Sequence, residues 1–293
     1  MSPHSLRIIA FNFAFFNVSK RNQDFPKKLE NFQVDFKKPF YTSLKQRRIS
    51  TMTYQNIFKR YEIKFILTFA NRKDLMEAMS GIMKIDKYGH TTIRNIYFDT
   101  GNFRLIRTSL DKPVYKEKLR VRSYQRVTGD DPVFVELKKK YDSVVYKRRI
   151  AMTESIASEW LEEGCPAPYD SQIAKEIGYF VNFYQDIGPK VFLSYEREAF
   201  YPEDGSDIRI TLDSNIIARD YDLSLQKGVY GRIILDRNLS VLEVKVPETM
   251  PVWLIRFLRE NNIAKSSFSK YGMYYMNSLK EAQKERNGGL LYA

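Results

Sequence analysis

The sequence contains few of the residues that most often carry covalent or metal chemistry. Its 293 residues include a single cysteine, Cys165, and two histidines, His4 and His90. One cysteine excludes an internal disulfide framework and a multi-cysteine metal site, and two histidines leave little for histidine catalysis or a zinc centre. No apolar run approaches the roughly 18 residues that cross a bilayer, so a transmembrane helix is excluded and a cytoplasmic protein is expected.

Positive charge, by contrast, is in excess. The chain has 48 Lys and Arg against 35 Asp and Glu, a formal net charge of +13. Residues 1–51 lack sustained periodicity and end in a basic run just before Met52. We predict that residues 1–51 are a disordered leader, a basic surface-binding arm, or sequence upstream of a wrongly assigned start, and that residues 52–293 form the folded domain. A basic balance indicates a polyanionic partner such as nucleic acid, acidic membrane or phosphates.

Seven segments of the folded domain alternate between an apolar and an ionic face. In residues 115–124, Lys116, Lys118, Arg120 and Arg122 fall on one face of a strand because side chains two apart share a face. The same alternation puts the following on ionic faces: Arg60, Glu62 and Lys64; Glu136, Lys138 and Lys140; Lys147 and Arg149; Tyr195 and Arg197; Arg209, Thr211 and Asp213; Glu243 and Lys245. A single strand of this kind is typical of an antiparallel sheet with one face in water.

The repetition of arginine on these faces favours a second interpretation. Arginine presents a planar fork that suits phosphate oxygens, whereas lysine serves solubility equally well. If the strands closed into a barrel with the ionic faces inward, about a dozen cations would line a channel, and their repulsion would favour an anion of high charge density. The pattern therefore predicts a chain of phosphates as the ligand.

Helical patterns lie between and after the strands. They predict helices over residues 72–83, capped by Asn71, over 154–163 and 171–185, over a segment opened by Thr249 and Pro251 that ends at Asn261, and from Ser267 or Ser269 to about residue 286. The order predicts an α+β fold, with an antiparallel closed β-barrel, flanking helices and a C-terminal helix.

Several motifs together resemble the VTC (vacuolar transporter chaperone) domain, the polyphosphate polymerase branch of the triphosphate tunnel metalloenzymes. They run in order from about Lys59 to Leu279. The motifs are residues 58–65 (FKRYEIKF), 97–100 (YFDT), 118–122 (KLRVR), 134–138 (FVELK), 147–149 (KRR), 242–245 (LEVK) and 268–271 (FSKY). The resemblance implies a tunnel barrel that transfers the terminal phosphoryl group of ATP to inorganic polyphosphate.

The resemblance also implies roles for individual residues. It places Lys64, Arg120, Arg122, Lys138, Lys147, Arg197, Arg209 and Lys270 around the triphosphate and the growing chain, with Glu243 as the ligand of Mn²⁺ or Mg²⁺ and Lys245 on its strand face. Lys118, Glu136 and Arg149 share these ionic faces and are expected to contact substrate as well. A hard divalent ion prefers carboxylate and phosphate oxygens, and phosphoryl transfer needs mainly alignment and charge neutralisation.

Two other functions remain open. A tunnel triphosphatase would hydrolyse a nucleoside or inorganic triphosphate, and a non-catalytic module would bind polyphosphate, RNA or acidic lipid. Nucleic acid is not expected, because aromatics such as Phe65, Phe134 and Tyr146 fall on apolar faces or strand flanks rather than among the cations. ATP and inorganic polyphosphate are the expected partners, and a membrane partner that receives product is compatible with the sequence.

Overall fold

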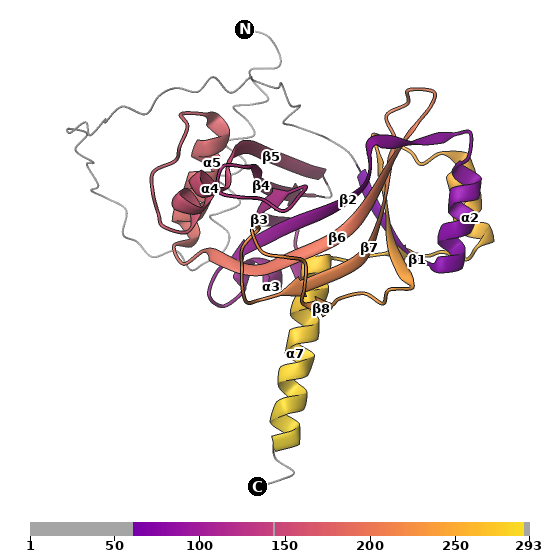
Figure 1. Cartoon of the computed structure of the whole chain (residues 1–293). Helices are drawn as coiled ribbons and strands as arrows, with labels where there is room; N and C mark the ends of the chain where they lie inside the picture. Colours follow the sequence, from indigo (N-terminus) through magenta and orange to yellow (C-terminus); the bar gives the residue numbers. More distant parts are fainter. Residues whose placement is uncertain (1–60, 143, 290–293) are drawn as a thin grey trace. The chain divides into compact units, whose positions relative to one another are not determined.

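The computed structural model describes residues 61–142 and 144–289, and in this range an antiparallel sheet of ten strands is accompanied by six helices (Figure 1). The strands are β1 (Tyr61–Thr68), β2 (Met83–Asp99), β3 (Tyr115–Ser123), β4 (Pro132–Tyr141), β5 (Val144–Thr153), β6 (Gly188–Pro202), β7 (Arg209–Arg219), β8 (Arg232–Ile233), β9 (Leu239–Val246) and β10 (Lys265–Ser266). The helices are α2 (Phe69–Met79), α3 (Arg104–Leu110), α4 (Glu154–Leu161), α5 (Gln172–Tyr184), α6 (Val252–Glu260) and α7 (Lys270–Gly289). The predicted α+β class is confirmed. The predictions about residues 1–51 lie outside the described residues.

The sheet curls strongly without closing. Its strand order is β10-β1-β9-β7-β6-β2-β3-β4-β5, with β8 beside β7. Although β1 and β4 are far apart in this order, Lys138 Nζ lies 2.9 Å from Glu62 Oε2, so the sheet brings its two sides together. Within residues 61–142 and 144–289 no ladder of hydrogen bonds joins β5 to β1 or β10. The closed barrel expected from the sequence is therefore not confirmed, and the structure has an open, curled sheet.

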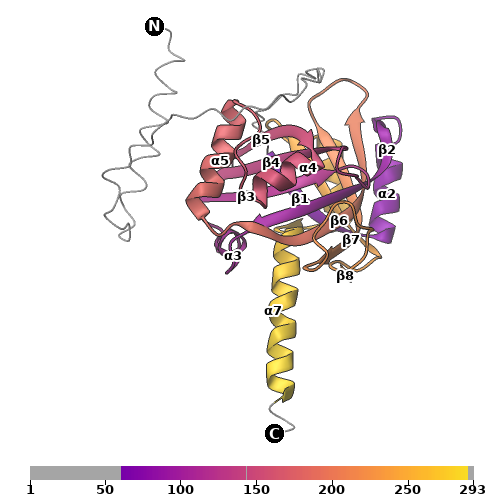
Figure 2. The same ribbon diagram turned by 60° about the vertical axis from the view of Figure 1, so that its left-hand side comes forward.

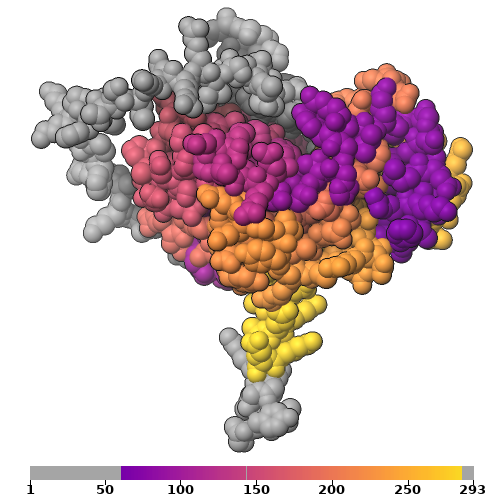
Figure 3. Space-filling view, in the orientation of Figure 1, coloured from indigo at the N-terminus to yellow at the C-terminus, as the bar shows by residue number. Residues whose placement is uncertain are grey.

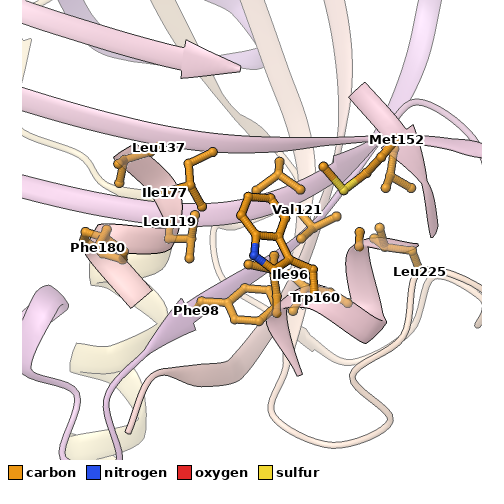
Figure 4. Packing of buried hydrophobic residues seen from close by; sticks show 14 of the residues in the cluster. Ile96, Phe98, Leu119, Val121, Leu137, Met152, Trp160, Ile177, Phe180 and Leu225 are labelled. Carbon is orange, nitrogen blue, oxygen red and sulfur yellow. The ribbon is translucent and has the colours of Figure 1, made fainter. Parts of the chain in front are cut away.

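Two apolar cores lie on the outer face of this sheet. The first joins β2–β5 to α4 and α5, and Trp160 lies at its centre between Ile96 and Val121 (Figure 4). The second joins β1, β7 and β9 to α2 and α6, with Leu75 and Leu254 both fully buried. Figures 1 and 2 show the two groups of helices over different parts of the sheet. Burial of the alternate apolar residues thus turns the ionic residues of the same strands toward the inside of the curl.

A third apolar core fills one end of the interior. Along β6 the inward residues change from Arg197 to Tyr195, Leu193 and Val191, and the last three are buried. These residues pack with α3 and the first turns of α7, which then extends away from the other described elements (Figure 3). The interior is therefore ionic toward one end of the strands and apolar toward the other. None of the helices in the described part of the chain is long and apolar enough to cross a membrane.

Asp99 ties the elements of this third core together. Its carboxylate is fully buried and accepts hydrogen bonds from the backbone N–H of Leu105 (2.8 Å) and Ile106 (3.0 Å), at the start of α3. It also accepts one from the Tyr271 hydroxyl of α7 (2.9 Å). The Thr100 N–H donates to it as well (2.8 Å), so this buried carboxylate has four donors and is well satisfied, and it fixes the position of α7 against the sheet.

Helix boundaries differ in part from the prediction. Thr68, not Asn71, is the N-cap of α2: the Asn71 N–H donates to Thr68 Oγ1, and the Thr68 N–H donates to Asn71 Oδ1. The helix therefore starts before the predicted residue 72, and it ends at Met79 because Gly81 turns the chain into β2 with a φ of +74°. For α7 the sequence left two starts open, and Ser269 is the one whose hydroxyl accepts from a first-turn N–H.

Candidate anion-binding site

A cavity of about 660 Å³ lies on the ionic part of the sheet interior. Nine elements contribute to its lining, namely β1–β7 without exception, β9 and the start of α7. The cations on the lining are Lys64, Lys118, Arg120, Arg122, Lys138, Lys147, Arg149, Arg197, Arg209, Lys245 and Lys270. They are accompanied by only three carboxylates, Glu62, Asp86 and Glu243, which leaves a formal charge of +8 on the lining.

The structure brings together the residues predicted from the sequence. Of thirteen such residues, twelve line this cavity. The thirteenth, Glu136, is 1% exposed and lies behind the lining, so it contacts the cations rather than the cavity. Arg209 is at the exposed rim, where its guanidinium lies 3.1 Å from Asp86. The roles of these residues toward substrate stay predictions.

Glu136 holds four of the cations in place. Its carboxylate accepts from Arg120 Nε at 2.8 Å and lies 2.6 Å from Lys147 Nζ, with Arg149 at 3.5 Å and Arg122 at 4.0 Å. The strand register produces this cluster, because Glu136 on β4 is directly opposite Arg120 on β3 and Arg149 on β5. Burial alone would raise the pKa of the Glu136 carboxyl, but the surrounding cations hold it well below its usual value. The carboxylate therefore stays ionised.

Asp213 does the same for two more cations. Arg197 Nε and Nη2 donate to its two oxygens at 2.6 and 2.7 Å, and Lys270 Nζ lies 2.5 Å away. Burial opposes ionisation, yet Arg197 and Lys270 lower the pKa of Asp213 to about 2. The sequence placed Asp213 on an ionic face but gave it no role at the site. Only the pairing of β6 with β7 puts it opposite Arg197.

Glu62 and Glu243 form a third group of carboxylates that pair with cations of the lining. Lys64 Nζ is 3.3 Å from Glu62 Oε1 and 3.4 Å from Glu243 Oε2, so both carboxylates face one position. Lys138 and Lys245 pair with the same two carboxylates. Burial would raise the pKa of Glu62, but Lys138 and the neighbouring lysines lower it to about 2. Glu62 was also given no role from the sequence, although it lies two residues from Lys64 on the same face.

This pair of carboxylates fits a hard divalent ion in part. Two oxygen donors converge where a cation, the Lys64 ammonium, already lies between them. Among the described residues no group of three or more His, Cys, Asp and Glu side chains could hold a metal ion. The donor set thus suits an ion that takes its remaining ligands from phosphate oxygens and water, as Mg²⁺ usually does.

Two lysines of the lining, Lys118 and Lys147, have pKa values far below the usual value for lysine. Burial, together with Lys64 and Lys138, lowers the pKa of Lys118 to about 7. Burial also lowers the pKa of Lys147 to about 7, because burial and the repulsion of Arg122 and Arg120 together outweigh the attraction of Glu136. Both lysines would regain their charge if an anion entered the cavity. The lining is therefore short of negative charge.

Aromatic side chains support the arginines. The Tyr97 hydroxyl accepts from Arg120 and the Tyr195 hydroxyl from Arg122, both at 3.0 Å. Phe134 lies under Arg149, with the guanidinium carbon 3.5 Å from the ring centre. Phe134 was predicted on an apolar face or a strand flank, away from the cations, and this was wrong: it lines the cavity and shares the β4 face of Glu136.

Comparison with known proteins identifies the family. The sequence profile described as the VTC domain matches residues 59–278. No curated protein shows significant sequence similarity to the chain.

Solved structures with a related arrangement include a candidate adenylate cyclase from Bacillus halodurans, with 16% identity, a TM-score of 0.48, and 73% of this chain and 96% of that chain covered. A Hippeastrum protein, described as a candidate adenylyl cyclase with a dominant triphosphatase activity, has 18% identity and a TM-score of 0.46, with 74% and 96% covered. A protein from Pyrococcus horikoshii has 13% identity and a TM-score of 0.38, with 74% and 99% covered. At these scores the likeness supports no inference about activity.

Proposed function

The chain belongs to the VTC domain family, and from this premise we propose that it is a metal-dependent polyphosphate polymerase that uses ATP. The observation that carries the proposal is the cavity lined by eleven cations and three carboxylates. One ATP molecule alone could not neutralise this charge, whereas ATP together with a bound chain of phosphates could. The family assignment and the excess of charge thus support the same class of substrate.

The proposed reaction is an in-line phosphoryl transfer. A terminal oxygen of the polyphosphate chain forms a bond to the γ-phosphorus of ATP, the bond from that phosphorus to the β–γ bridging oxygen breaks, and ADP leaves with the electron pair. Such transfers depend mainly on alignment and on stabilising charge around the transferred group. No residue of the cavity needs to form a covalent intermediate.

The arginines and the lysines of the cavity have different roles in this reaction. Arg120 and Arg197 are each held by a buried carboxylate, so their remaining N–H groups keep a fixed direction toward phosphate oxygens. Lys118 and Lys147 supply charge that adapts to the occupant, because their pKa values lie near 7 when no anion is bound. Rigid forks thus orient the phosphates, and the lysines neutralise them.

Glu243 and Glu62 are the residues proposed to hold Mn²⁺ or Mg²⁺. The ion would add positive charge at the β- and γ-phosphate oxygens and help to stabilise the charge that develops there. The Lys64 ammonium, which lies between these two carboxylates, is the group that would have to shift for both of them to hold an ion.

Product analysis tests the proposal. The purified full chain is incubated with ATP and Mn²⁺, with and without a short polyphosphate primer, and the products are separated on a gel stained for polyphosphate. A ladder that grows with time and is lost in Glu243→Gln supports the polymerase. Free phosphate without chains indicates the triphosphatase, and neither product together with tight polyphosphate binding indicates a binding module. Glu176→Gln, a carboxylate on the outer face, is the matched control.

A further inference from the structure

The cationic face of β3 and β4 continues beyond the lining of the cavity. Lys118 and Lys138, which line the cavity, are directly opposite each other in the β3–β4 ladder. Two residues further along the same strands, the next pair on the inner face is Lys116 directly opposite Lys140. Residues two apart on a strand share a face, so these four lysines lie in two successive rows on the inner side.

Lys116 lies in a surrounding made of other lysines. Its pKa is lowered by partial burial and by the charges of Lys140, Lys138, Lys64 and Lys112. Its ammonium donates one hydrogen bond to the carbonyl of Ser109 at 3.1 Å. An ammonium has three N–H donors, so two others can donate elsewhere. Among residues 61–142 and 144–289, no carboxylate lies within ion-pair distance of Lys116 or Lys140.

The outer face of the same ladder shows that this is not a general property of the strands. Between the two lysine rows, Glu117 is directly opposite Lys139 on the outer face, and their charges lie 3.8 Å apart. Opposite charges across a ladder stabilise the pair, and like charges in that position destabilise it. The two strands therefore carry a complementary pair outside and two repulsive pairs inside. An anion along the inner rows would remove this repulsion.

From this arrangement we infer that Lys116 and Lys140, here called the lysine track, hold the part of a linear inorganic polyphosphate that lies outside the cavity. The inference rests on the proposed function for its ligand. From Arg122 to Lys116 the strand covers about 20 Å at 3.3 Å per residue, which is longer than a triphosphate. A ligand that reaches from Arg122 to Lys116 must therefore be a chain of several more phosphates.

The lysine track gives the site a means to retain its product. A chain held at the lysine track stays bound while ADP leaves and the next ATP enters. An inorganic triphosphate, which occupies the cavity alone, gains nothing from the lysine track. The inference thus predicts that the affinity for a long polyphosphate exceeds the affinity for triphosphate, and that Lys116 and Lys140 account for the difference.

Binding of two ligands to the full chain tests this inference. Affinities for inorganic triphosphate and for a long-chain inorganic polyphosphate are measured over a range of salt concentrations. The double variant Lys116→Gln/Lys140→Gln is compared with Lys139→Gln/Lys175→Gln, which removes the same charge from the outer side, where Lys139 pairs with Glu117 and Lys175 with Asp170. Glutamine removes the charge and keeps an N–H donor for the Ser109 carbonyl, on a side chain one atom shorter than that of lysine.

The expected result is selective. The track variant loses about tenfold in affinity for the long chain, and the slope of log affinity against log salt becomes shallower by about 1.4, while its affinity for triphosphate is unchanged. An equal loss for both ligands, or an equal loss in the control variant, would overturn the inference. A wild-type chain that makes no polyphosphate from ATP would overturn the proposed function but not the lysine track, because added polyphosphate is bound without turnover.

Discussion

The inner face of β3–β5 carries nine charged residues and the outer face three, and the two faces also pair their charges differently. On the outer face each charge has a nearby partner: Glu117 is opposite Lys139, and Arg148 donates to Glu176 of α5 at 2.8 Å. On the inner face one buried carboxylate, Glu136, is shared among four cations. Alternation of charged residues alone therefore does not identify a site. A face whose cations outnumber its carboxylates and line a common cavity does.

The largest expected effect comes from removing the shared carboxylate. Glu136→Gln leaves its cations buried without a counter-charge, and breaking a buried ion pair in this way costs about 3–5 kcal/mol. We expect the free energy of unfolding, measured with urea, to fall by that amount in the ligand-free chain. A loss below about 1 kcal/mol would mean that the inner face behaves like an ordinary solvated face.

The next effect concerns turnover. Arg120→Ala removes a fixed guanidinium from the cavity and is expected to lower the rate of ATP turnover by about 10²–10³-fold, as the loss of one preorganised donor does elsewhere. Arg148 on β5 faces outward, and Arg148→Ala should leave the rate unchanged. Equal losses in the two variants, with both folded by circular dichroism, would contradict a catalytic role for the inner face.

The pH dependence of binding should follow the two lysines with pKa values near 7. Between about pH 6 and 8, Lys118 and Lys147 lose their charge in the empty cavity, and a bound polyanion restores it by taking up to about two protons. Affinity for long-chain polyphosphate should therefore fall as pH rises through 7. Calorimetry in buffers of different ionisation enthalpy counts the protons. Lys118→Arg, which does not titrate, should reduce the uptake, and an unchanged uptake would contradict the assignment.

The smallest effect is expected on the outer face. Glu176→Gln removes the partner of Arg148 from a partly exposed pair, which is worth about 1 kcal/mol or less. The affinity for polyphosphate should not change. A marked loss of affinity would show that the outer face also contributes to the anion site, and the contrast between the two faces would then fail.

The inner face could be predicted largely from the sequence because its signal is local. Side chains two apart on a strand share a face wherever the strand lies, so the cations from Lys116 to Arg122 were placed together before their partners were known. The carboxylate contacts were not predictable in this way. Asp213 meets Arg197 only through the β6–β7 register, and Glu62 meets Lys138 only because the sheet curls.

The predicted start of α2 was wrong and the predicted closure of the barrel was not confirmed, for related reasons. Thr68 and Asn71 are both good capping residues, and they cooperate in one capping box, so composition did not show which of them begins α2. Closure of the barrel needs a ladder between strands that are far apart in the chain, and no alternation pattern reports that ladder. The position of Phe134 was predicted wrongly, because an aromatic ring suits an apolar face or a strand flank, whereas this ring shares the strand face of Glu136 and lies under Arg149.

The most direct test of the central claim is thermal and chemical unfolding of the full chain with increasing inorganic triphosphate, at matched ionic strength. If the inner face is an anion site, the free energy of unfolding rises by about 2.7 kcal/mol when the ligand reaches 100 times its dissociation constant. The rise should be lost in Arg120→Ala and kept in Arg148→Ala. A shift no larger than that given by potassium chloride would contradict the account.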